Sequence, residues 1–331
     1  VHYIQNVMYG GWMLRGIHHY MAQVTIVLLV LHLMQVLVDG AYRAPREVNF
    51  WFGLGLLGLV LGLSLTGYLL PWDQKGYWAT KVATSIASMT PVVGPAMQQL
   101  MVGGAEYGHH TLTRFFALHA GALPAGIVLL IVGHVYLFRR HGITVPKKAA
   151  EKPDGWFWPE QVLKDSVASL IVMATVLALV LWNGGAHLGA PADPTEPYAA
   201  ARPEWYFMFL FQWLKYFPAG WEVVGAQIIP GIAVGMIAAM PIIGKWRLGH
   251  RFNLGVAASL LAGIMMLTWT AYAADRADPA FVQARAEAAS IAERVSELAG
   301  SPDGIPAAGG LAMLRGDPAT QGPIIFEANC S

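Results

Sequence analysis

Residues 18–38 read HHYMAQVTIVLLVLHLMQVLV, and this stretch decides the class of fold. An α-helix needs about 20 mostly apolar residues to cross a bilayer, and the run from Val24 to Val38 supplies most of them. With five more such stretches, the candidate spans cover roughly 19–38, 51–70, 115–138, 164–182, 223–243 and 253–273. Open sheet edges cannot face lipid, so all six are expected to be helices. The sequence therefore predicts an all-α, polytopic transmembrane helical bundle.

The composition points to the same environment. The chain has 331 residues, of which 56% are hydrophobic and only 12% charged, about half the charged fraction of a soluble domain. So little polar surface could not cover a soluble core of this size, whereas lipid accepts apolar side chains. The net charge of +1 does not favour nucleic acid as a partner. Cys330 is the only cysteine, which excludes internal disulfides and a multi-cysteine metal site within this chain.

Basic residues predict the orientation of the spans, because short loops rich in Lys and Arg stay on the cytoplasmic side. The loops 39–50, 139–163 and 244–252, with their flanks, hold most of these residues: Arg43, Arg46, Arg139, Arg140, Lys147, Lys148, Lys152, Lys164, Lys245, Arg247 and Arg251. An even number of spans then puts both visible ends on the opposite side. We expect a multi-pass protein of the bacterial inner membrane whose C-terminal tail is periplasmic.

Four histidines stand out within the first and third spans. His18 and His32 are fourteen residues apart, and His119 and His134 are fifteen apart. Four helical turns take about 14.4 residues, so each pair returns to nearly one face of its helix, about 21 Å apart. The two spans run in the same direction, which puts His18 level with His119 and His32 level with His134. Two imidazoles can fill both axial positions of a haem iron, an arrangement that favours electron transfer. The alternative interpretation is a set of satisfied core histidines, and the matched spacing favours two stacked b haems.

Two glycines and two arginines support the haem interpretation. Gly53 and Gly67 are also fourteen residues apart, and glycine lets a bulky planar ring approach the backbone, so we expect them to lie against the edges of the haems. The alternative is that small residues simply allow membrane helices to pack. Arg15 and Arg114 lie just outside the first histidine pair, where they could pair with haem propionates or serve as ordinary interfacial arginines.

Together with the sequence around them, these residues make the chain resemble the cytochrome b of quinol–cytochrome c and quinol–plastocyanin oxidoreductases, the bc-type complexes. The resemblance rests on four segments: GWMLRGIHHY (11–20), LHLMQVLVDGAYRAPRE (31–47), LTGYLLPWDQKGYW (65–78) and PEWY (203–206). The fifteen-residue histidine gap is similar to the shorter, chloroplast-type cytochrome b, here fused to a part that resembles its separate partner subunit. The family has one more span ahead of the first haem helix, which is missing from this sequence.

The resemblance implies roles for particular residues. His18 and His119 would ligate the haem nearer quinol oxidation, and His32 and His134 the haem nearer quinone reduction. Within the PEWY motif, Glu204 would accept a quinol proton and Tyr206 would line the site, beside Pro203 and Trp205. We expect Tyr68, Pro71 and Trp72 to wall the same pocket. A carboxylate in an apolar pocket has a raised pKa and can take up and release a proton; the alternative for Glu204 is a plain loop carboxylate. Arg139 would serve the quinone-reduction site or act as a positive-inside anchor.

The activity that the resemblance implies is quinol oxidation with the two electrons sent along different routes. One would pass to a Rieske iron–sulfur protein in another chain and then to a c-type cytochrome. The other would cross two b haems to reduce quinone on the cytoplasmic side, with proton translocation. The family also implies a homodimeric complex. Two other functions stay open: a haem-b membrane anchor of a quinone-linked dehydrogenase, and a transporter bundle without haem.

The chain divides into three parts on this interpretation. Residues 1–148 form the di-haem part, 149–274 carry three further spans with the PEWY loop, and 275–331 form a tail. The tail is rich in Ala, Pro and Gly around a charged helical stretch at Pro279–Leu298, which suggests an exposed linker. Its end, GLAMLRGDPATQGPIIFEANCS, resembles the approach to a haem c attachment site with Cys330 as the first cysteine. A truncated cytochrome c domain carrying haem c is therefore expected, and the alternative is a free thiol.

Overall fold

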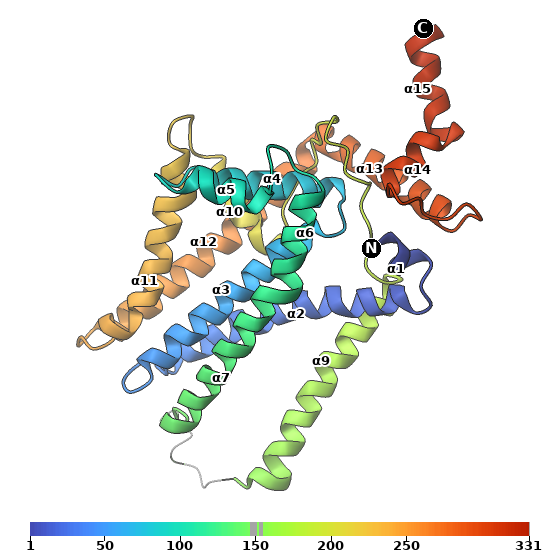
Figure 1. Cartoon of the computed structure of the whole chain (residues 1–331). Coiled ribbons are helices and arrows are strands. Elements are labelled where there is room, and N and C mark those ends of the chain that lie inside the picture. The colour runs from blue at the N-terminus through green and yellow to red at the C-terminus, as the bar shows by residue number, and fades with distance from the viewer. Residues whose placement is uncertain (146–150, 152–154, 331) are drawn as a thin grey trace.

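The computed structural model describes residues 1–145, 151 and 155–330, and these residues are mostly helical with no named strand. Six helices or helix runs are long and apolar enough to cross a membrane: α2 (Gly11–Val38), α3 (Glu47–Leu69), α6–η1–α7 (His109–His141), η2–α9 (Phe157–Trp182), η4–α11 (Val224–Ile243) and α12 (Gly249–Ala277). The six predicted spans and the all-α class are confirmed (Figure 1). Lys147, Lys148 and Lys152 of the predicted basic loop lie outside the described residues.

Short helices cover one end of the bundle (Figure 1). They are α4 (Gln74–Ser88), α5 (Gly94–Val102) and α10 (Met208–Leu214), and α1 (His2–Asn6) precedes the first span. α4 begins at Asp73, whose carboxylate accepts a hydrogen bond from the backbone N–H of Gly76 at 2.8 Å. This N-cap satisfies a donor that a helix start leaves unpaired.

The loops at the other end of the bundle are tied to one another. Arg46 donates hydrogen bonds to the carbonyls of 141–143 at 2.9 to 3.2 Å. Lys245 pairs with Glu47 at 3.4 Å, and the Tyr42 hydroxyl lies 2.9 Å from Nδ1 of His250. The described parts of the three basic loops therefore lie at one end of the bundle, as the charge pattern predicts.

Two of the spans contain a π-turn just ahead of a proline. η1 (Leu118–Ala122) precedes Pro124, and η4 (Val224–Ile228) precedes Pro230. A proline ring clashes with the carbonyl four residues earlier in an α-helix, and that carbonyl lies inside the π-turn in both cases. The wider turn relieves the clash by admitting one extra residue, and His119 sits within the first of these turns.

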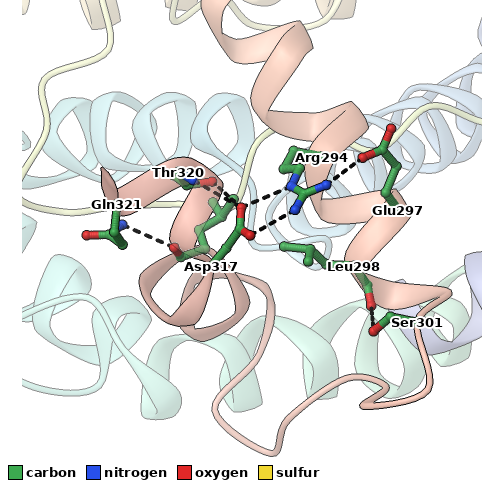
Figure 2. A network of polar contacts seen from close by, with 8 residues as sticks. Arg294, Glu297, Leu298, Ser301, Asp317, Thr320 and Gln321 are labelled. Atoms are coloured by element: carbon green, nitrogen blue, oxygen red, sulfur yellow. Dashed lines mark hydrogen bonds and ion pairs between the residues drawn. The ribbon is translucent and has the colours of Figure 1, made fainter. Parts of the chain in front are cut away.

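The tail differs from the expected exposed linker. It forms α13 (Pro279–Ala299), α14 (Gly310–Gly316) and α15 (Pro318–Cys330), and α15 projects away from the bundle (Figure 1). Val295, Ala299, Met313 and Leu314 form a small buried cluster between α13 and α14. Arg294 donates to both carboxylate oxygens of Asp317, at 2.9 and 2.8 Å (Figure 2). The average composition of the tail does not reveal this packed pair of helices, because their few apolar residues recur at helical spacing on one face.

Candidate functional site

The first histidine pair is formed by α2 and η1. The rings of His18 and His119 lie opposite each other, with centroids 6.0 Å apart and ring planes nearly perpendicular at 89°. Two imidazoles on opposite sides of one metal ion, each bonded at about 2 Å, place their ring centroids about 6 Å apart. Nδ1 of His119 donates to the Leu63 carbonyl at 3.0 Å, which leaves Nε2 as the free ligand atom. The pair therefore fits the two axial positions of one haem iron.

The second pair lies near the other end of the same helices. His32 and His134 line one cavity of about 260 Å³, together with Gly53. Nδ1 of His134 donates to the Asn49 carbonyl at 3.1 Å, the same arrangement as at His119. Among the described residues, α2 and α7 (Leu123–His141) do not pack closely on each other, whereas α3 packs along α7. The helices thus present two histidine pairs across a shared space.

Gly53 and Gly67 lie against the histidine rings. A Cβ on Gly67 would stand 2.5 Å from Cε1 of His119, and one on Gly53 would stand 3.3 Å from Cε1 of His134. Any residue other than glycine at position 67 would therefore force the His119 ring to move. The sequence analysis expected haem edges against these glycines, whereas in the structure each glycine lies against the imidazole of a neighbouring span.

Of the four remaining predicted cofactor residues, the two arginines Arg15 and Arg114 hydrogen-bond to neighbouring segments, and Arg139 and Cys330 are exposed. Arg15 donates to Gln5 and to the carbonyls of Ala186 and His187. Arg114 donates to the Leu100 carbonyl. The Arg15 guanidinium thus bonds to α1 and to the loop after α9, and the Arg114 guanidinium bonds to the end of α5. Arg139 is exposed near the end of α7, and Cys330 is an exposed free thiol at the end of α15.

The PEWY motif forms a short turn between two helices. Glu204 stands at the N-cap of η3 (Trp205–Phe207), which leads directly into α10. Gln23 of α2 accepts a hydrogen bond from Nε1 of Trp205 at 2.5 Å, and its amide also hydrogen-bonds the Glu204 carboxylate. Gln23 was missed at the sequence level. Its signal was a polar residue within an apolar span, five positions after His18.

Titration behaviour separates the two polar side chains of this turn. Burial raises the pKa of Glu204 above its ordinary value, and the positive charge of Lys75 and the Gln23 hydrogen bond oppose the rise. Burial raises the pKa of Tyr206 to about 12, with the charge of Glu204 adding to the effect. Of the two side chains, Glu204 is therefore the candidate for taking up and releasing a proton, because its pKa is raised by burial while the Tyr206 phenol stays protonated.

Two of the three residues predicted to wall the pocket, Tyr68 and Trp72, bond to the segment that leads into this turn. The Tyr68 hydroxyl donates to the Arg202 carbonyl at 3.1 Å, one residue before Pro203. The Trp72 carbonyl accepts from the Ala192 N–H at 3.0 Å. The end of α3 and the loop after it are thus joined to the segment that carries PEWY.

Six membrane-spanning helices that hold two histidine pairs define a multi-pass membrane bundle suited to cofactor binding. Residues 23–191 match the family model described as cytochrome b (N-terminal)/b6/petB. The chain belongs to the cytochrome b family.

Relatives and a solved structure agree. The chain is 44% identical over 147 residues to the menaquinol:cytochrome c reductase cytochrome b subunit of Geobacillus thermodenitrificans, covering 44% of this chain and 66% of that protein. It is 33% identical over 254 residues to cytochrome b of Rhodobacter capsulatus, covering 72% and 57%. The chain therefore spans less than two thirds of these relatives. A chain of a hyperthermophilic respiratory Complex III shares the fold, with a TM-score of 0.62, 23% identity and 81% of both chains covered.

Proposed function

We propose that this chain is the two-haem cytochrome b subunit of a proton-translocating quinol:cytochrome c oxidoreductase, or of a relative with a similar acceptor. The observation that carries the proposal is the His18–His119 pair, whose rings stand 6.0 Å apart with Nδ1 of His119 occupied by a carbonyl. His18 with His119, and His32 with His134, would hold one haem b each. When bound, the two haems would supply a path for electrons across the membrane.

Quinol oxidation would take place beside the PEWY turn. Glu204 would accept a proton from the quinol hydroxyl, because burial raises the pKa of its carboxyl group above the ordinary value and so favours proton uptake. Gln23 and Trp205 would hold the carboxylate in place, and Tyr206, with its phenol protonated, would line the site as a donor. The turn lies at the end of the bundle opposite the basic loops, which is the side where released protons must leave.

The partners follow from the same proposal. Relatives named as menaquinol:cytochrome c reductase subunits support a quinone substrate and a cytochrome c acceptor. A Rieske iron–sulfur protein in a separate chain and a homodimeric complex are implied by the family resemblance, as is quinone reduction near Arg139. We place the basic loops in the cytoplasm and the tail in the periplasm of a bacterium. A haem c attached at Cys330 stays a prediction.

The test is quinol:cytochrome c reductase activity of the purified complex, measured with a short-chain quinol. We expect Glu204→Gln to lower kcat by about 10²-fold or more, because a proton acceptor is lost, while haem b content stays unchanged. Glu196→Gln alters an exposed carboxylate in the same loop and is the matched control. Haem b without reductase activity in the unaltered complex would instead favour the dehydrogenase anchor, and absence of haem b would favour the transporter bundle.

A further inference from the structure

A buried ion pair lies directly beside the PEWY turn. Nε of Arg202 donates to both carboxylate oxygens of Asp275 at 3.0 Å, and Nη2 donates to Oδ1 at 2.8 Å. The two side chains are only 17% and 6% exposed. Arg202 immediately precedes the motif, and Asp275 lies in the last turn of α12. The end of α12 is therefore bonded to Arg202, the residue just ahead of the PEWY turn.

Aromatic rings and a backbone contact hold Arg202 further. Its guanidinium carbon stands 4.7 Å from the ring centroid of Phe211 in α10 and 4.6 Å from that of Phe281 in α13. Its carbonyl accepts the Tyr68 hydroxyl of α3. A planar guanidinium both forks onto a carboxylate and stacks on aromatic rings, whereas a lysine ammonium cannot fork in this way.

The tail also contacts the start of this loop. Arg315 of α14 pairs with Asp193 at 3.4 Å. A Cβ on Gly310, the first residue of α14, would stand 2.9 Å from Cγ of Pro191. The tail thus contacts the segment 191–202 near both of its ends. The Arg294–Asp317 pair and the apolar cluster hold α13 and α14 together as one unit (Figure 2).

We infer that the Arg202–Asp275 pair, supported by the contacts of α13 and α14 with the segment 191–202, forms a clamp that fixes the PEWY turn, so that Arg202 and Asp275 are positioning residues for Glu204. The inference rests on the proposed function. The segment 183–203 has no regular helix of its own, so its conformation must be imposed by what it contacts. A displacement of about 1 Å in a reactive group can cost about 10²-fold in rate, which is why such an anchor matters here.

The test compares Arg202→Lys, Asp275→Asn and the double variant in the intact complex. We expect each single variant to lower kcat/KM for a short-chain quinol about tenfold, since the fork is lost while the haem ligands are untouched. The double variant should fall little further, because both residues belong to one contact. Hydrogen–deuterium exchange of peptides covering 199–208 should rise in all three, with haem b content unchanged.

Lys164→Ala is the matched control, because it breaks an exposed ion pair with Glu160 at the other end of the bundle. The clamp would be overturned if hydrogen–deuterium exchange over 199–208 and kcat/KM in Arg202→Lys and Asp275→Asn were the same as in Lys164→Ala. If Arg202→Lys loses haem b, Arg315→Ala is used in its place, because the Arg315 side chain is 63% exposed and its loss should not disturb folding. Hydrogen–deuterium exchange over 189–208 that is unchanged in Arg315→Ala would then overturn the inference. An inactive unaltered complex would count against the proposed function alone, because the exchange measurement does not depend on activity.

Discussion

Gly67 shows how the size of one residue sets the position of a proposed haem ligand, His119. Its added Cβ would stand 2.5 Å from Cε1 of His119, closer than real Cβ atoms approach any atom, so the ring would have to shift. We therefore expect Gly67→Ala to lose about half of the bound haem b, because one of two ligand pairs is disturbed. Haem content by pyridine haemochrome is the measurement.

Gly62→Ala is the control for that substitution. It lies in the same helix, and its Cβ would make an ordinary 3.7 Å contact with Leu123. Full haem content in Gly67→Ala would contradict the role given to this glycine, and loss of haem in both variants would point to general instability of α3.

Gln23 should control the pH dependence of quinol oxidation. Its hydrogen bond stabilises the ionised carboxylate of Glu204, which lowers the pKa of that group, while burial raises it. Gln23→Leu keeps the burial and removes the hydrogen bond, so the pKa of Glu204 rises further. Glu204 must be ionised to accept a proton, so the acid limb of the kcat/KM profile should move to higher pH.

A suitable control is Gln99→Leu, at an exposed position in α5. The pH profile of kcat/KM is compared among both variants and the unaltered complex. A Gln23→Leu profile that coincides with the other two, or moves to lower pH, would show that this side chain does not act on Glu204.

At the scale of a single helix, the unequal histidine spacings have a structural cause. Fifteen residues of regular α-helix would leave His134 about 60° out of line with His119, at about 100° per residue. The π-turn at Leu118–Ala122 takes up one residue, which makes the pair equivalent to the fourteen-residue pair of α2. Pro124 was the signal in the sequence, because a proline inside a helical pattern has to distort the turn before it.

The same scale shows what the sequence could predict. Apolar runs were enough to predict the six spans, because they depend on local composition. The helical period and the shared direction of the first and third spans predicted His18 level with His119, and their ring centroids lie 6.0 Å apart. The contact partners of Gln23, Arg202 and Asp275 could not be predicted, because these contacts join residues that are 73 to 182 positions apart. In the tail, the predicted helical stretch at Pro279–Leu298 corresponds to α13 (Pro279–Ala299), whereas the packing of α14 on α13 was missed, because the buried cluster between them contains few residues.

At the scale of the whole molecule, the two ends of the bundle should face different compartments. In a Cys330→Ser background, Ala289→Cys lies on exposed α13, and Leu248→Cys lies in the exposed loop between α11 and α12. In right-side-out vesicles, a membrane-impermeant maleimide should label Ala289→Cys directly and Leu248→Cys only after detergent is added. The opposite labelling pattern would reverse the orientation that the basic loops predict.

The most direct measurement of the central claim is a reduced-minus-oxidised spectrum of the purified complex with pyridine haemochrome quantification. The paired imidazoles of His18 with His119 and of His32 with His134 predict two haems b per chain, both reduced when quinol is added. A complex that contains this chain but no haem b, or whose haem b quinol does not reduce, would contradict the account.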